Sequence, residues 1–154
     1  MTVQTGTRTT RPRTTRALQA GVVLQVVCLL LPLLDLWIFG TIERHVEAAY
    51  PEWGPDDVAV DRNAIAITLA VVGVLGLPGW AGALWATRRN TGLRATVTTL
   101  FALGMVTLLS VAAMGGEPYD RYVPLWLGTT TLLLLAVPGV AAVVAVFREA
   151  GDRR

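Results

Sequence analysis

The sequence has few charged residues and few side chains suited to redox or metal chemistry. Charged residues make up 16% of its 154 residues, against roughly 25% in an average soluble domain. Its one cysteine, Cys28, excludes a disulfide or a CxxC redox pair within the chain. Its one histidine, His45, means that a histidine-based metal centre would need other ligand types or other subunits. We therefore expect neither a metal nor a cofactor.

The sequence also lacks lysine and the short motifs of soluble enzymes. All 13 basic residues are arginine, and the net charge of +2 is too small to indicate a nucleic-acid partner. There is no Walker A motif, no glycine-rich dinucleotide fingerprint in a soluble context, no HExxH and no GxSxG. The acidic residues between positions 52 and 61 lack the ligand spacing of a known calcium loop. No catalytic constellation can be recognised in the chain.

Long apolar runs dominate what is present. Hydrophobic residues make up 53% of the chain and the mean hydropathy is +0.54. Four runs cover residues 17–39, 64–86, 95–114 and 122–147. At about 1.5 Å per residue, each run is long enough to cross a hydrocarbon core of roughly 30 Å. Because a backbone in lipid must satisfy its own hydrogen bonds, we predict an all-α polytopic membrane protein, a four-helix transmembrane bundle with the lipid bilayer as its partner.

Most arginines lie on one side of the predicted spans. Ten of the thirteen flank the start of the first run, the turn between the second and third, or the end of the fourth: Arg8, Arg11, Arg13, Arg16, Arg88, Arg89, Arg94, Arg148, Arg153 and Arg154. Excess arginine marks cytoplasmic segments, so we expect a plasma-membrane protein with both termini in the cytoplasm. Residues 1–16, rich in threonine and arginine, then form a disordered cytoplasmic tail, and residues 148–154 form a second cytoplasmic tail.

Residues 40–63 form the longest polar segment between the predicted spans, on the expected outer side. Apolar residues recur there at helical spacing, at Ile42, Val46, Ala49 and Tyr50. The pattern predicts a short amphipathic helix over Thr41–Tyr50 at the outer interface, or an extension of the first span. Pro55 followed by two carboxylates is typical of a helix start, which favours a second helix that begins well before residue 64.

Several features recur between the two halves of the sequence. An Asp-Arg pair precedes the second and fourth runs, and each of these runs contains a Pro-Gly pair, at positions 78–79 and 138–139. The first and third runs both open with Arg-Ala. The recurrence suggests two duplicated helical hairpins related by an axis along the membrane normal. Chance recurrence among abundant residue types is the alternative.

One ionisable residue, Asp35, falls inside the first predicted span. Small and polar residues share one helix face with it, at Gly21, Gln25, Cys28, Pro32 and Asp35, because their spacings alternate between four and three. In a functional interpretation, Asp35 and Gln25 bind a proton, ion or ligand in a bundle cavity. In the alternative, the stripe serves helix packing, Pro32 kinks the helix, and Asp35 reaches outer water or Arg62.

The second predicted span carries four glycines at a spacing of three. They are Gly73, Gly76, Gly79 and Gly82, and Pro78 lies among them. We expect these residues to permit close packing around a kink; a hinge, or a kinked helix that lines a site, is the alternative. Pro138 has the same expected role in the fourth span. Trp80 and Trp85 lie toward the cytoplasmic end and are expected to anchor the interface there.

Part of the sequence resembles a known group of membrane proteins. The residues that carry the resemblance are His45 to Pro51 (HVEAAYP), Val71 to Gly76 (VVGVLG), and Gly79 with Trp80. They are similar to a family of small four-helix integral membrane proteins from actinobacteria. The likeness covers roughly residues 43–104 and is weaker across the fourth run. That family has no assigned activity, so the resemblance implies the four-span architecture and carries over no functional residue.

Three functions are compatible with this sequence. The first is a non-catalytic accessory, scaffold or regulatory protein that works with a membrane-protein partner or a second copy of itself; it predicts a packed bundle without a wet cavity. The second is a small oligomeric transporter or channel, which predicts a cavity that reaches Asp35 beside Gln25 and the kinked second helix. The third is a membrane enzyme for a lipid-like substrate, for which Asp35, His45 and the outer carboxylates would have to converge. The absence of a catalytic constellation favours the first.

Overall fold

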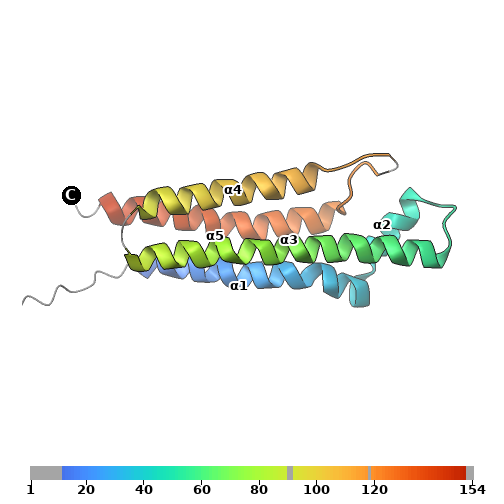
Figure 1. Cartoon of the computed structure of the whole chain (residues 1–154), viewed down its shortest axis with the longest axis horizontal. Helices are drawn as coiled ribbons and strands as arrows, with labels where there is room; N and C mark the ends of the chain where they lie inside the picture. The colour runs from blue at the N-terminus through green and yellow to red at the C-terminus, as the bar shows by residue number, and fades with distance from the viewer. Residues whose placement is uncertain (1–11, 90–91, 118, 152–154) are drawn as a thin grey trace, which may run out of the picture.

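A computed structural model describes residues 12–89, 92–117 and 119–151. These residues form α1 (Pro12–Leu34), a π-helix η1 (Asp35–Phe39), α2 (Thr41–Ala49), α3 (Pro55–Arg89), α4 (Leu93–Ala113) and α5 (Leu125–Gly151), as Figure 1 shows. Four helical segments are long and apolar enough to cross a membrane: α1 continued by η1, α3, α4 and α5. The predicted fold class, an all-α multi-pass membrane protein, is confirmed.

Each spanning helix extends beyond its predicted apolar run at one or both ends. The helix α3 has 35 residues, roughly 50 Å of helix for a hydrocarbon core of roughly 30 Å. It begins at Pro55, with Asp56 and Asp57 in its first turn, where carboxylates oppose the positive end of the helix dipole. The fourth spanning helix starts at Leu125 instead of residue 122 and continues to Gly151. The excess length places the ends of the helices outside the apolar layer.

The first helix begins five residues earlier than predicted, at Pro12 instead of Ala17. Its first turn is held by Glu149 at the end of α5, whose Oε1 accepts a hydrogen bond from the Arg13 N–H at 2.9 Å. The Thr14 hydroxyl donates to Glu149 Oε2 at 2.8 Å, and Thr14 is fully buried. Residues 12–16 of the predicted tail are therefore helical. The N–H groups of their first turn have no acceptor within the helix, and the Glu149 carboxylate, distant in sequence, accepts from them. Residues 1–11 and 152–154 lie outside the described part.

The chain bends sharply between α1 and α2 at a π-helical turn. Pro32 has no N–H to donate within α1, and the wider turn Asp35–Phe39 directly follows Leu34, the last residue of that α-helix. The Gly40 N–H then bonds to the Asp35 carbonyl at 2.8 Å. Gly40 has φ of 59°, a left-handed conformation that favours glycine. The bend at Gly40 allows α2 to pack across the start of α3.

The short helix α2 covers the segment for which the sequence pattern predicts an amphipathic helix. Its two apolar anchors, Ile42 and Val46, are fully buried and pack with Val58 of α3 and Leu127 of α5. An ion pair between Arg62 Nη1 and Glu43 Oε2 at 2.6 Å joins α2 to α3 at their edge. The segment is thus docked on the bundle and is not a continuation of the first span.

The helix α1 is at the centre of the packing. It contacts α3 and α5 along much of its length, whereas α4 contacts α3 and α5 less extensively. In the most apolar stretch of α4 only 6% is buried inside the bundle, against 33% in the corresponding stretch of α5. The two predicted hairpins, α1 with α3 and α4 with α5, therefore pack unequally in the bundle. This unequal packing does not test the predicted duplication.

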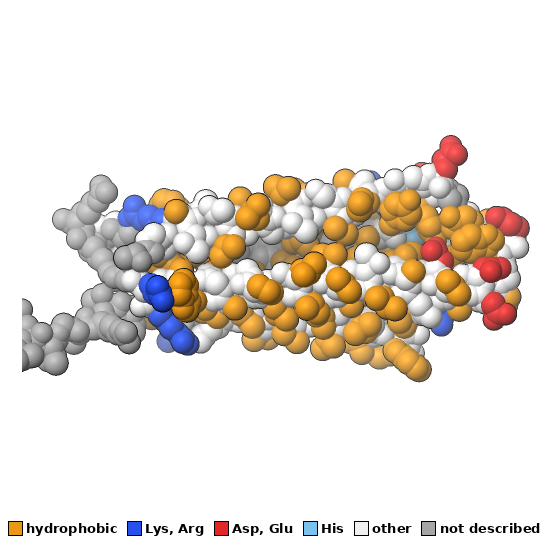
Figure 2. Space-filling view, viewed as in Figure 1, with side chains coloured by type: hydrophobic (Ala, Val, Ile, Leu, Met, Phe, Trp, Pro, Cys, Tyr) orange, Lys and Arg blue, Asp and Glu red, His pale blue; other side chains and the backbone are white. Residues whose placement is uncertain are grey.

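Charges of opposite sign collect at opposite ends of the molecule. Figure 2 shows arginine side chains at the end where α3 finishes and α4 begins, and carboxylates at the end that carries α2. The described chain begins and ends at the arginine end, where Glu149 meets the start of α1. The surface between the two ends is largely hydrophobic, as a bilayer requires.

Candidate functional site: an apolar cavity inside the bundle

A cavity of about 530 Å³ lies between the spanning parts of α1, α3, α4 and α5 and is open at the side of the bundle. It separates two packed clusters of apolar side chains, one around Leu18 and Val146 toward the arginine end, the other around Val46 and Leu127 toward the acidic end. In Figure 2 the molecule is hollowed between the row of side chains on α4 and the row on α3. The cavity exists because α4 stands away from α1.

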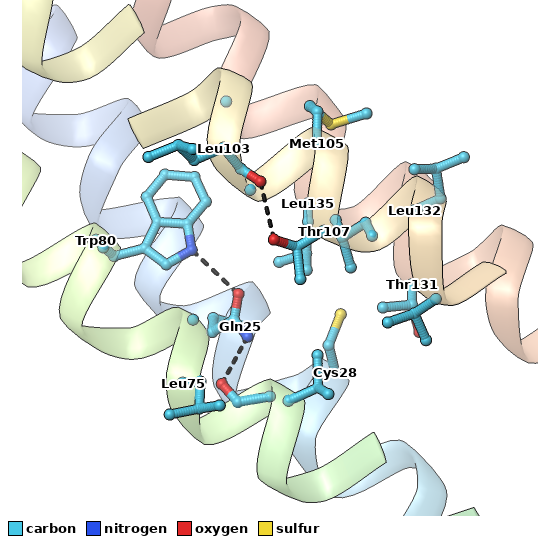
Figure 3. Close-up of a pocket in the computed structure, with 18 of the residues that line it drawn as sticks. Gln25, Cys28, Leu75, Trp80, Leu103, Met105, Thr107, Thr131, Leu132 and Leu135 are labelled. Atoms are coloured by element: carbon cyan, nitrogen blue, oxygen red, sulfur yellow. Dashed lines mark hydrogen bonds between the residues drawn. The ribbon is translucent and has the colours of Figure 1, made fainter. Parts of the chain in front are cut away.

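Gln25 of α1 forms a hydrogen-bonded clamp at the wall of this cavity. Its Nε2 donates to the Gly73 carbonyl of α3 at 2.8 Å, and its Oε1 accepts from the Trp80 Nε1–H at 3.1 Å, as Figure 3 shows. The side chain is 95% buried, so both partners are needed to offset the loss of water. Pro78 has no N–H, so the carbonyl of Val74, the residue after Gly73, lacks its donor within the helix.

Three glycines allow this clamp to form. A Cβ atom at Gly21 would lie 2.2 Å from the Trp80 ring, and one at Gly76 would lie 2.5 Å from Gln25 Nε2. A Cβ atom at Gly73 would lie 3.2 Å from the Leu29 Cα. These contacts bring α1 and α3 close together, as small residues do in membrane helix pairs.

The other glycines and prolines of the predicted set behave differently. A Cβ atom at Gly79 would meet no other atom within 4 Å, and one at Gly82 would have its nearest neighbour at an ordinary 3.7 Å. Pro78 is exposed, whereas Pro138 is buried in α5. Next to Pro138, a Cβ atom at Gly139 would lie 2.4 Å from the Phe101 ring of α4. For Gly79, Gly82 and the two prolines, both the expected packing around a kink and the alternative of a hinge stay predictions.

Asp35 does not line the cavity, although Gln25, Cys28 and Pro32 of the same stripe do. Its side chain is fully buried and accepts hydrogen bonds from the Thr41 hydroxyl and, at 2.8 Å, from the Ile42 N–H. The carboxylate therefore caps the first turn of α2. Trp126 Nε1 donates to the Thr41 oxygen at 2.9 Å and extends this network to α5.

The alternative in which Asp35 reaches outer water or Arg62 is wrong. Arg62 is paired with Glu43, and Asp35 has no exposure to solvent. The reason is the bend at Gly40, which places the start of α2 against Asp35, so that Thr41 and Ile42 supply its hydrogen-bond donors. Sequence spacing along one helix could not show that the next helix would turn back to this carboxylate.

The polar atoms at the cavity are few. Cys28 and Thr131 project toward it in Figure 3, and the Thr107 hydroxyl donates to the Leu103 carbonyl of its own helix at 3.0 Å. Across the described ranges, no group of three or more histidine, cysteine, aspartate or glutamate side chains is placed to hold a metal ion. The cavity can bind hydrocarbon, and its wall offers no carboxylate or imidazole for proton transfer.

Trp80 does not have its predicted role of an interface anchor. Its ring packs on Gly21 and with the cluster around Leu18, and its N–H is used by Gln25. Trp85 is 55% exposed, and the Arg89 guanidinium lies 4.1 Å from its ring centroid, an arrangement suited to an interface. The two tryptophans differ because residue 80 faces α1 and residue 85 does not.

An aromatic cluster closes the acidic end of the bundle, and sequence reasoning did not find it. Tyr119 stacks on His45 with ring centroids 5.3 Å apart, meets Tyr50 edge-on at 5.4 Å, and donates its hydroxyl to Asp61 Oδ2 at 2.5 Å. Burial, and then the bond to the Asp61 carboxylate, raises the pKa of Tyr119 well above its usual value. His45 Nε2 lies 2.6 Å from the Arg121 carbonyl. These residues join the loops at the acidic end of the molecule to one another, and none of them lines the cavity.

Comparisons with models of protein families, with curated proteins and with solved structures give no match for this chain. The resemblance to small four-helix membrane proteins of actinobacteria therefore stays a prediction from the sequence.

Proposed function

We propose that this chain is a non-catalytic accessory or regulatory protein of the plasma membrane, and that it acts by holding a lipid-like molecule in its intramembrane cavity. The observation that supports this function is the cavity of about 530 Å³ within the membrane-spanning part, lined almost entirely by apolar side chains. Binding pockets for small molecules commonly have volumes of about 300–1,000 Å³.

An apolar cavity of this size favours an occupant. Side chains that face an empty space lose the dispersion contacts they would make with neighbouring atoms. Water gains little in such a place, since it needs two or more polar partners and most polar atoms at the wall are already bonded. A hydrocarbon chain from the bilayer restores the contacts without breaking a hydrogen bond.

The positions of the titratable groups favour binding over catalysis. Asp35 caps α2, His45 and Asp61 belong to the aromatic cluster, and none of the three lines the cavity. A membrane enzyme would need such groups to converge on the bound substrate.

A small oligomeric transporter or channel is the second candidate, and the central position of the cavity is the observation in its favour. A route through the bundle that used Asp35 would require the carboxylate to leave Thr41 and Ile42. Gln25 would likewise have to leave Trp80 and Gly73. Flux through the purified chain therefore distinguishes the two candidates.

We also propose that the arginine end of the bundle faces the cytoplasm, so that both termini are cytoplasmic. The support is the separation of charge along the molecule, with Arg88, Arg89, Arg94 and Arg148 at one end and α2 with its carboxylates at the other.

The substitution Gly104→Phe tests the binding function. Gly104 lines the cavity, and a Cβ atom there meets nothing within 4 Å, so a phenyl group can enter the space without moving the backbone. The probe is a fatty acid with a photoreactive group at the end of its chain, incorporated into vesicles with the full-length chain. We expect light to attach it to wild-type residues at the cavity, such as Met105 and Leu132, and Gly104→Phe to abolish this attachment.

Val106→Phe is the matched control, since Val106 lies on the same helix, is 63% exposed and does not line the cavity. It should label at the cavity as wild type does. Equal labelling of cavity residues in Gly104→Phe would refute the proposed binding. Protein-dependent flux of an ion or small solute in the same vesicles, lost in Asp35→Asn, would instead establish the transporter.

A further inference from the structure

A shallow groove runs along the outside of the bundle on α5, separate from the cavity. Its residues are Ala136, Val137, Val140, Ala141, Val144, Ala145 and Arg148 of α5, with Arg13 of α1. The α5 positions recur at helical spacing and form one face of the helix. Apart from Arg148, the α5 residues that line the groove are alanines and valines, so the groove is shallow and apolar along its length. Among the residues that the structure describes, the charged side chains that line it are the two arginines, which come from the beginning of α1 and the end of α5.

The length of the groove corresponds to one leaflet. From Ala136 to Arg148 there are twelve residue steps, which is about 18 Å of helix, against about 15 Å for half of the hydrocarbon core. Arg148 lies in the last turn of α5, at the end of the molecule where the arginines collect. The groove therefore extends from near the bilayer centre to one membrane surface, and its two positive charges lie at that surface.

Among the described residues, Glu149 is the carboxylate at this end of the molecule, and it forms no ion pair with either guanidinium group. Both oxygens of Glu149 accept hydrogen bonds from the first turn of α1, from the Arg13 N–H and the Thr14 hydroxyl. The ion pair found in the described part of the chain joins Arg62 and Glu43 at the opposite end. Arg13 and Arg148 are both exposed. A phosphate can approach them from the lipid surface, where guanidinium groups bind phosphate oxygens through paired N–H donors.

We propose that this groove binds one anionic phospholipid of the leaflet at the arginine end, with its phosphate between Arg13 and Arg148 and one acyl chain along the alanine and valine face. The charges select an anionic lipid, and the length of the groove fits one leaflet. Basic sites between membrane helices on the cytoplasmic side are suited to anionic headgroups. This site is independent of the cavity proposed above, because it lies on the outer face of α5 and shares no lining residue with it.

Native mass spectrometry of the full chain tests the proposal. The chain is released from micelles that contain equal amounts of phosphatidylglycerol and phosphatidylcholine with identical acyl chains. We expect wild type to retain one phosphatidylglycerol in preference to phosphatidylcholine. The double substitution Arg13→Gln with Arg148→Gln should lower that preference roughly tenfold, since each arginine near an anionic lipid surface adds to the attraction. Both side chains are exposed, so the helix packing is retained.

A second double substitution, Arg88→Gln with Arg89→Gln, is the matched control. It removes the same charge from the same end of the molecule but outside the groove, and it should leave the preference unchanged. Ala141→Phe raises the floor of the groove without changing charge, and it should reduce lipid retention while the arginines remain.

Four outcomes would overturn the proposal. The first is equal retention of the two lipids by wild type. The second is an equal loss of preference in the Arg88 and Arg89 control, which would indicate general electrostatic attraction. The third is displacement of the lipid by glycerol phosphate at micellar lipid concentrations, which would indicate a site for free phosphate. The fourth is a lipid-free dimer that Ala141→Phe disrupts, which would assign the groove to a second copy of the chain.

Discussion

A buried carboxylate in a membrane span is costly, and Asp35 illustrates how the fold itself can offset that cost. Its oxygens accept the Ile42 N–H and the Thr41 hydroxyl, two donors at the start of a helix whose first turn has no internal acceptors. The charge also opposes the positive end of the α2 dipole. Asp35 thus has a structural role in fixing the bend between α1 and α2.

We predict that Asp35→Ala destabilises the protein by about 1–3 kcal/mol, because it leaves the Ile42 N–H buried without an acceptor. Asp35→Asn should cost less, since the amide oxygen can still accept one of the two hydrogen bonds. The measurement is the midpoint of thermal unfolding in detergent, followed by circular dichroism. Glu52→Ala is the control, an exposed carboxylate at the same end of the molecule, and it should change stability by less than about 0.5 kcal/mol. An Asp35→Ala variant as stable as wild type would contradict the capping role.

At the scale of the element, the stripe on α1 was predictable because helical geometry alone places its residues on one face. Gly21, Gln25, Cys28, Pro32 and Asp35 are all buried, and the same spacing continues to Thr14 and Leu18, which are buried as well. The function of each member was not predictable. Gln25 contacts α3, whereas Asp35 contacts α2, and these partners depend on where the other helices lie.

The glycines of α3 show the same division. Their strict spacing of three moves around the helix by about 60° at each step, so they cannot all face α1. Gly73 and Gly76 meet α1, while Gly79 faces open space beside the cavity. A spacing in the sequence thus indicates close packing for the helix but does not say at which glycine the contact occurs.

We predict opposite effects for alanine at two of these glycines. Gly76→Ala should destabilise the protein by about 1–2 kcal/mol, because the new methyl group displaces the Gln25 amide from Trp80 and Gly73. Gly79→Ala should be neutral or stabilise by up to about 1 kcal/mol, because alanine favours the helix and meets no atom there. Detergent unfolding midpoints measure both. Equal effects of the two substitutions would show that the clamp contributes nothing.

At the scale of the whole molecule, charge and packing are arranged along different directions. Most arginines and most carboxylates lie at opposite ends of the bundle axis, whereas burial varies across it: the apolar parts of α5 and α1 are the most buried and that of α4 is the least. The first arrangement concerns insertion in the membrane, since arginine is retained on the cytoplasmic side. The low burial of α4 leaves the cavity between this helix and the other spanning helices, and the cavity is the basis of the proposed binding function.

We predict the orientation as both termini inside the cell. In a Cys28→Ser background, which removes the one native thiol, Glu52→Cys and Gly151→Cys place single cysteines at exposed positions on opposite ends of the molecule. A membrane-impermeant maleimide applied to intact cells should label Glu52→Cys, and it should label Gly151→Cys only after permeabilisation. The reverse pattern would overturn the orientation, and with it the assignment of the groove on α5 to the cytoplasmic leaflet.

The sequence by itself determined the solvent of this protein and the number of its spans. Four apolar runs of sufficient length must be helices in lipid, because no other single-chain segment satisfies its own backbone hydrogen bonds there. The start of α3 at Pro55 and the amphipathic segment from Thr41 follow from local rules of the same kind, in which residues near in the chain act on one another.

Only the tertiary structure decided which polar groups meet. Glu149 holds the first turn of α1, Tyr119 reaches Asp61, and Trp80 turns inward to Gln25 instead of outward to the interface. Each pair is separated by more than fifty residues, so its contact depends on how the helices pack and not on local pattern. The cavity has the same origin, since it is the space left where α4 does not reach α1, and no segment of the chain encodes that space alone.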